Sequence, residues 1–324
     1  MVGRTAPATV CVLGGTGFVG RSIAARLTSA GYAVRVPTRH QARHRELLVL
    51  PGIELIETDI HNERNLSALL AGAHAAINLV GILNEKGRDG TGFHHAHVAL
   101  VEKLTAACQA QGVSRLLQMS ALKANAERGA SHYLRTKGSG EGVIKNMAGR
   151  GFHYTIFQPS VIFGPDDSFA NRFAGLLRLL PVFPLAKPDA RFAPVYVEDV
   201  AEAFLRALAA EAAIDQTYQL CGPETYSLQE IVELVAQTME IKRIVVGLPD
   251  TLSRMQAGLM DHLPGKPFSV DNFRSLTVPS TCTEDGLAAL GITATPMNVV
   301  LPRYLRDQSP RQQLLSRLRQ HAGR

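Results

Sequence analysis

The sequence predicts an α/β fold in which helices cover both faces of a doubly wound parallel sheet, with a smaller, mostly helical C-terminal lobe. Three observations lead to this prediction. Short β-rich runs alternate with segments of helical periodicity over the first 160 residues. The strand-like runs are mainly apolar, as in strands buried between two helix layers. Several helical segments end in glycine, which often terminates helices.

The expected elements follow one another from the N-terminus. Strands are expected at 8–14, 33–38, 53–58, 75–81, 115–120 and 153–159, and helices between them at 20–31, 62–72, 99–112 and 138–151. Later helical segments lie at 168–180, 198–212, 227–239 and 249–262. We therefore expect a sheet domain over 1–160, a C-terminal lobe over 161–310 with some sheet-completing segments, and a basic tail over 311–324.

Composition indicates a globular protein. The chain has 324 residues, of which 46% are hydrophobic and 19% are charged, and no apolar run approaches the length of a membrane helix. A strand-like run begins near Thr9, too early for a signal peptide, which predicts a cytoplasmic protein. Four cysteines stand at 11, 108, 221 and 282 without CxxC spacing. We expect neither a zinc site nor a disulfide from them, in agreement with a reducing compartment.

The net charge of +6 is concentrated partly at the C-terminus. The segment 311–324 contains Arg311, Arg317, Arg319 and Arg324 and no acid. One interpretation is a solvated tail. The other is a short basic amphipathic helix that touches an anionic membrane surface, at the inner face of the plasma membrane, or an acidic partner. No recognition-helix or RNA-binding motif suggests a nucleic acid.

The most informative stretch is VLGGTGFVGRS at 12–22, where an apolar strand runs into four glycines and then a helix. The pattern Gly15-x-Gly17-x-x-Gly20 allows a tight turn and a close approach of backbone to a pyrophosphate at the helix N-terminus. It predicts a Rossmann-type dinucleotide site. The expected contacts are Gly14, Gly15, Thr16, Gly17, Phe18, Val19, Gly20 and Arg21.

The end of the second strand favours NADP(H), with NAD(H) as the alternative. NAD enzymes usually carry an acid there for the ribose 2′-hydroxyl, but VRVPTRHQARHR at 34–45 contains none. Arg39 stands at the expected position, with Thr38, His40 and Arg43 nearby, and could bind a 2′-phosphate. Arg21 is a second candidate. The remaining interpretation is a solvated basic loop.

Further cofactor contacts are expected at the ends of later strands. Asp59 could accept a hydrogen bond from the adenine amino group while Ile60 lines the ring, unless Asp59 caps the next helix. Leu79, Val80 and Gly81 would run past the adenosine ribose, and Pro159 ends the sixth strand.

The candidate catalytic residues are Ser120, Tyr133 and Lys137. Tyr133 and Lys137 share a helix face at a spacing of four, thirteen residues after Ser120 at the end of the fifth strand. A lysine ammonium and a nicotinamide cation beside the tyrosine favour its phenolate, so that Tyr133 could exchange a proton with a substrate oxygen during hydride transfer. Lys137 would hold the nicotinamide ribose and Ser120 would orient the carbonyl, unless Ser120 only bonds backbone.

With these motifs, the turn PSVIFGP at 159–165 and VYVEDVA at 195–201, the chain resembles the short-chain dehydrogenase/reductase superfamily. Later segments resemble its atypical branch, which includes the nucleotide-binding accessory subunit nine of respiratory complex I and bacterial relatives. The resemblance implies NAD(P)H binding. It implies one of two functions. The first is an enzyme linked to quinone or respiratory metabolism, either an oxidoreductase of carbonyls and alcohols or an epimerase. The second is a non-catalytic accessory protein of a respiratory or ubiquinone-synthesis complex.

One position departs from the pattern of the superfamily. His97 stands where active extended relatives often carry an asparagine that supports the lysine, which puts the proton relay in question. His94, His95 and His97 cluster, but no cysteine or carboxylate stands at ligand spacing, and we expect no metal.

Overall fold

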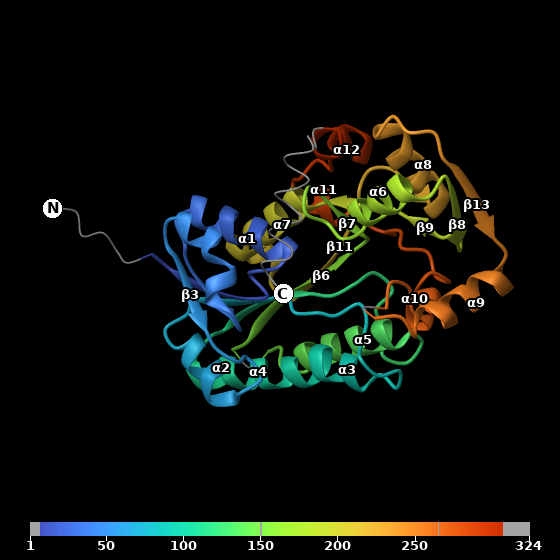
Figure 1. Cartoon of the computed structure of the whole chain (residues 1–324). Coiled ribbons are helices and arrows are strands. Elements are labelled where there is room, and N and C mark those ends of the chain that lie inside the picture. The colour runs from blue at the N-terminus through green and yellow to red at the C-terminus, as the bar shows by residue number, and fades with distance from the viewer. Residues whose placement is uncertain (1–6, 150, 265, 307–324) are drawn as a thin grey trace.

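A seven-stranded parallel sheet forms the centre of the structure, a computed structural model that describes residues 7–149, 151–264 and 266–306 (Figure 1). Its strand order is β11-β6-β5-β4-β1-β2-β3. The strands are β1 (Thr9–Leu13), β2 (Ala33–Thr38), β3 (Ile53–Glu57), β4 (Ala75–Asn78), β5 (Arg115–Met119), β6 (His153–Pro159) and β11 (Gln216–Leu220). This order confirms the doubly wound sheet, because the chain winds outward from β1 in both directions. The predicted tail at 311–324 lies outside the described residues.

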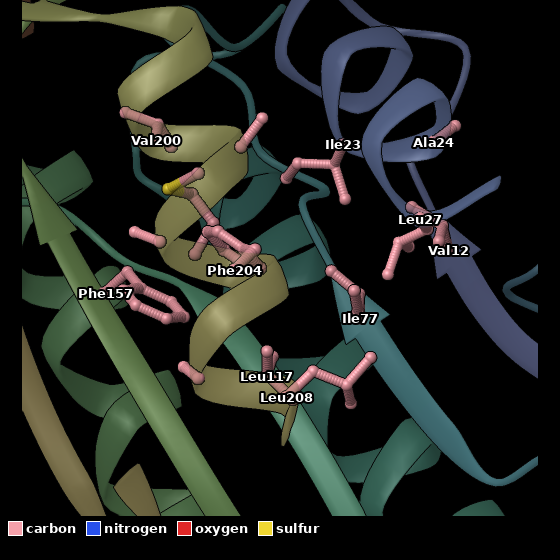
Figure 2. Packing of buried hydrophobic residues seen from close by; sticks show 14 of the residues in the cluster. Val12, Ile23, Ala24, Leu27, Ile77, Leu117, Phe157, Val200, Phe204 and Leu208 are labelled. Atoms are coloured by element: carbon pink, nitrogen blue, oxygen red, sulfur yellow. The ribbon is translucent and has the colours of Figure 1, made fainter. Parts of the chain in front are cut away.

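Helices cover both faces of this sheet. On one face lie α1 (Phe18–Ser29) and α7 (Val197–Ala209), and on the other α2 (Glu63–Leu70), α4 (Leu100–Gln111) and α5 (His132–Lys145) (Figure 1). Figure 2 shows the first layer, in which Phe204 of α7 packs on Phe157 of β6 at a centroid distance of 4.1 Å. The apolar strands predicted two covered faces, and the two buried clusters confirm them.

A third apolar cluster holds the C-terminal lobe together. It combines α6 (Ala170–Leu179), α8 (Leu228–Thr238) and α12 (Met297–Leu305) with short strand pairs. The pairs are β7 (Ile162–Phe163) with β10 (Val195–Tyr196), β9 (Arg191–Phe192) with β12 (Tyr226–Ser227), and β8 (Val182–Ala186) with β13 (Ile244–Leu248). The lobe also contains α9 (Asp250–Met260), α10 (Val270–Ser275) and α11 (Gly286–Ala289). Two segments that follow residue 160 in the sequence join the sheet domain: β11 is its edge strand, and α7 packs on one of its faces. The domain boundary near residue 160 stays a prediction.

The helix expected at 99–112 is confirmed by α4, whereas the next helix prediction was wrong in position. The helix expected at 138–151 is α5, which begins at His132 because the Ser131 hydroxyl accepts the Leu134 N–H and caps it. Glycines at 138, 140 and 142 weakened the helical pattern there. The helix expected at 99–112 is preceded by α3 (Thr91–His94) and a π-helical turn over His95–Ala99.

The expectation that the cysteines form no disulfide was also wrong, because Cys221 and Cys282 are joined. They are 61 residues apart in sequence, and the fold brings them together at the carboxyl end of β11. The segment near Ser280 crosses this edge, where its carbonyl accepts hydrogen bonds from the Ser160 hydroxyl and the Ala193 N–H. The spacing of the two cysteines in the sequence does not predict this disulfide, which follows from the tertiary fold. Cys11 and Cys108 are free and buried.

Within the described residues, no helix is long and apolar enough to cross a membrane.

Candidate functional site

The glycine turn between β1 and α1 has the backbone geometry that the motif predicts. Gly14 adopts a left-handed φ of +79°, and a Cβ on Gly20 would lie 2.3 Å from the Gly14 carbonyl oxygen. Both positions therefore exclude larger residues. A Cβ on Gly14 would also meet Leu79 and Val80 at 3.3 Å, so the turn lies against the end of β4 as expected.

The N-terminus of α1 is suited to an anion. Its N-cap residue is Gly17, no side chain caps it, and its first turn contains no acid. Free N–H groups and the helix dipole attract phosphate at such a position. The described residues therefore fit the pyrophosphate of a dinucleotide, which the backbone of the turn would hold.

The two candidate arginines for a 2′-phosphate have different surroundings. Arg39 is exposed at the end of β2 and has no carboxylate partner among the residues that the structure describes. Arg21 donates to Asp166 at 3.0 Å, in an ion pair that ties the glycine turn to the loop before α6. Arg39 is thus the better candidate, because Arg21 already has an anion.

Asp59 does not cap the helix that follows it. The cap of α2 is Asn62, whose side chain accepts from the backbone N–H groups of Arg64 and Asn65. Of the residues that the structure describes, only His61 donates to the exposed Asp59 carboxylate, through its backbone N–H at 2.9 Å. This leaves Asp59 accessible, and the adenine contact of Asp59 and Ile60 stays a prediction.

Tyr133 and Lys137 lie on the face of α5 that points to the carboxyl ends of β4 and β5. The Lys137 ammonium donates to the Met119 carbonyl at 3.2 Å, and a Cβ on Gly81 would lie 3.0 Å from its Nζ atom. The structure therefore brings Lys137 and Gly81 together. The half-buried Tyr133 ring packs edge-on against Phe93 and His97, and its hydroxyl bonds to none of the described residues.

Burial dominates the titration of both side chains. It raises the pKa of Tyr133 to about 12 and lowers the pKa of Lys137 to about 8, although the Glu141 carboxylate opposes the second change. Both changes disfavour the charged forms in a dry environment. The expectation that Lys137 and a nicotinamide cation together lower the pKa of Tyr133 stays a prediction. Lys137 sits near its titration point, where it could share a proton.

Ser120 faces a buried carboxylate that the sequence analysis missed. Its hydroxyl donates to Glu141 at 2.5 Å, and the same Oε1 atom accepts from the Gln158 amide at 2.8 Å. The other oxygen of Glu141 pairs with Lys145 at 3.2 Å. Ser120 thus uses its only proton inside the protein. Glu141 stands four residues after Lys137, a spacing that could have revealed it.

His97 is held as a neutral imidazole. Its Nε2 atom accepts from the Ile82 N–H at 3.1 Å, and its Nδ1 atom lies 2.9 Å from the Thr136 hydroxyl. Thr136 donates its own proton to the His132 carbonyl, so Nδ1 carries the imidazole proton. Burial, and next the charge of Lys137, lowers the pKa of His97 to about 2. With both nitrogens bonded, His97 supports the site without passing protons.

The C-terminal lobe fixes the start of the helix that carries Tyr133. Asp271 of α10 accepts from the N–H groups of His132 and Tyr133 at 2.7 and 3.1 Å. A cavity of about 260 Å³ lies beside this junction, between the loop 85–93 and the helices α9 and α10, and Phe93 lines it. Among the described residues no group of three or more metal-binding side chains was found.

A family comparison decides the relationship of this chain to known proteins. Residues 10–221 match the model of the NAD dependent epimerase/dehydratase family. The chain belongs to this family. The match extends from the glycine turn through Tyr133 and Lys137 to the end of β11, and it confirms the predicted resemblance.

Individual relatives differ in their described roles. The chain is 27% identical over 301 residues to NADH dehydrogenase [ubiquinone] 1 alpha subcomplex subunit 9 of Arabidopsis thaliana, covering 88% of this chain and 73% of that protein. It is 29% identical over 247 residues to the ceramide reductase of Caulobacter vibrioides, covering 74% of each. The fold is similar to UDP-glucuronic acid 4-epimerase from Bacillus cereus, solved with NAD, at a TM-score of 0.72 and 17% identity over 92% of this chain and 98% of that one.

Proposed function

We propose that this chain is an NADP(H)-dependent oxidoreductase that interconverts a carbonyl and an alcohol, in quinone or respiratory metabolism. The observation that carries the proposal is the position of Tyr133 near the buried Lys137 on one face of α5. The Tyr133 hydroxyl forms no hydrogen bond with any of the described residues. Bound NADPH would supply the hydride. Tyr133 would give its proton to the substrate oxygen. Lys137 would bind the ribose, and its positive charge, together with that of the nicotinamide formed by hydride transfer, would lower the pKa of Tyr133.

Ser120 has a smaller part in this proposal than its position suggests. Because its proton is directed at Glu141, Tyr133 would be the main proton donor to the substrate oxygen. The name of the Caulobacter relative, ceramide reductase, supports a reductase with an apolar substrate.

Turnover tests the proposal. The purified chain is incubated with NADPH and a panel of prenylated quinone precursors and long-chain ketones, and oxidation of NADPH is followed. We expect Tyr133→Phe to lower kcat at least a hundredfold with unchanged NADPH affinity. Tyr32→Phe, which removes the same hydroxyl from a residue between α1 and β2, should have no effect. Equal activity of Tyr133→Phe and the wild type would refute the role of Tyr133.

Cofactor choice is tested separately by titration. We expect NADPH to bind more tightly than NADH, and Arg39→Ala to weaken NADPH binding about tenfold while NADH binding changes little. Arg45→Ala, an exposed arginine of the same loop, is the matched control. Equal losses for both nucleotides would refute the contact between Arg39 and the 2′-phosphate.

A second candidate function is a nucleotide-holding accessory protein of a respiratory or ubiquinone-synthesis complex. The observation that favours it is the complex I subunit among its relatives, which matches over 88% of this chain. Affinity purification of the tagged chain from its own cells should then enrich the subunits of such a complex. Turnover of a substrate by the isolated chain without such enrichment would reject this alternative.

A further inference from the structure

Helix α9 exposes its large apolar side chains and buries its small ones. Leu252, Met255 and Leu259 are 43, 58 and 67% exposed, whereas Ser253 and Ala257 are fully buried. The spacing of three and four residues places the exposed side chains on one stripe of the helix. Leu263, 51% exposed just after the helix, extends the stripe. Helices of globular proteins normally bury such a stripe, so its exposure marks a contact surface.

The buried side of α9 explains why the helix keeps this orientation. Ser253 accepts from the Lys187 N–H and donates to the Leu248 carbonyl, which fixes the helix on the end of β8 and β13. Gln256 donates to the Pro184 carbonyl on β8. The apolar stripe therefore faces outward because polar contacts hold the opposite side, and rotation of α9 would break them.

The charges around the stripe are mainly positive. Each of the three carboxylates between 249 and 276 is already engaged: Asp250 with Lys187, Asp261 with Arg88 and Lys266, and Asp271 with backbone N–H groups of α5. Arg274 of α10 is exposed, lines the cavity next to Gly258 of α9, and has no carboxylate partner in the part of the chain that the structure describes. Arg254 of α9 instead lies over the Phe273 ring of α10, on a side of the helix away from the stripe. An apolar stripe next to a mainly positive surface of this kind is complementary to an anionic lipid surface.

We propose that α9 docks this protein on an anionic membrane, with the stripe Leu252–Met255–Leu259–Leu263 in the interface and Arg274 among the phosphates. A second copy of the chain is disfavoured as the occupant, because each copy has a net charge of +6. Docking is independent of whether the site turns over. It orients α10, which holds the N-terminus of the Tyr133 helix, toward the membrane.

Vesicle sedimentation with the full chain tests the proposal. The wild type should bind vesicles of phosphatidylcholine with 30% phosphatidylglycerol, bind pure phosphatidylcholine at least tenfold more weakly, and lose affinity as salt rises. The double variant Met255→Glu/Leu259→Glu should lose at least tenfold of the affinity for anionic vesicles. The matched control is Leu48→Glu/Val49→Glu, which adds the same charge at exposed apolar residues beside β3, at the other end of the molecule (Figure 1).

Each outcome decides the proposal. Loss of binding in the α9 variant alone, with unchanged melting temperature and molecular mass, supports it. Equal binding of both double variants overturns it, as does binding that disappears only when residues 307–324 are deleted. A wild-type dimer that the α9 variant converts to monomers without vesicle binding would assign the stripe to a second copy. Binding to a protein of the cell without affinity for anionic vesicles would assign it to that protein.

Discussion

Replacing Lys137 by methionine should stabilise the protein at pH 7. Burial lowers the pKa of this lysine from 10.5 to about 8, which corresponds to a cost of about 3 kcal/mol for holding the charge inside the folded chain. Methionine keeps the apolar volume without the charge. It loses the hydrogen bond to the Met119 carbonyl, worth about 1–2 kcal/mol, and Glu141 keeps its pair with Lys145. We therefore expect a gain of about 1–2 kcal/mol.

The pH dependence has a definite sign. Below about pH 8 the folded wild type carries the full cost of the buried charge. Between about pH 8 and 10.5 the folded chain has released the proton while the unfolded chain still binds it, so the stability of the wild type rises with pH. The advantage of the Lys137→Met variant over the wild type should therefore shrink as the pH approaches 10.5.

Urea denaturation of both proteins at pH 7 and 9.5 measures this difference. Lys242→Met, which removes an exposed lysine, is the matched control and should change the free energy of unfolding by less than about 0.5 kcal/mol. The reasoning fails if Lys137→Met is less stable than the wild type at pH 7, or if the difference is the same at both pH values.

Three further predictions concern the glycine turn, Ser120 and the disulfide. Gly20→Ala should abolish nucleotide binding and destabilise the fold, because its Cβ would lie 2.3 Å from the Gly14 carbonyl oxygen. Gly175→Ala, in an open part of α6, should do neither. Fluorescence titration with NADPH measures the difference in binding. Ser120→Ala should cost about 1–3 kcal/mol in urea denaturation by removing the donor to Glu141, with unchanged NADPH affinity; a fully stable variant would contradict the bond. Cys282→Ser should lower the free energy of unfolding by roughly 2–4 kcal/mol, and reductant should lower the melting temperature of the wild type but not of the variant.

The sheet was predictable because its signals are local. Apolar runs gave all six strands of the first half to within a few residues, and the glycine pattern predicted the turn before α1. The main error was the start of α5, which the helical segment predicted at 138–151 placed after Lys137, although Tyr133 and Lys137 were expected to share a helix face. That helix forms because tertiary contacts outweigh propensity: Ser131 caps it, and Asp271 from 138 residues away binds its first N–H groups.

The chemistry of the site was less predictable than its residues. Spacing placed Tyr133 and Lys137 on one face, but their pKa values follow from burial, which only the packed tertiary structure produces. The pairing of Cys221 with Cys282 and the bond from Ser120 to Glu141 likewise join residues that the fold alone brings together. Sequence patterns report faces and spacings, whereas the protonation of a group depends on everything packed around it.

The free-energy cost of burying the Lys137 charge bears on the two candidate functions. A protein that only held a nucleotide could bind the ribose with neutral hydroxyls or amides and avoid a buried ammonium. The chain instead retains a lysine whose pKa has fallen to about 8, a neutral His97 beside it, and a tyrosine hydroxyl that bonds to none of the described side chains. Destabilising features that persist together at one place are expected where function requires them. Proton transfer would use the tyrosine hydroxyl together with the lysine, whereas nucleotide holding requires only the lysine, and this asymmetry favours the oxidoreductase.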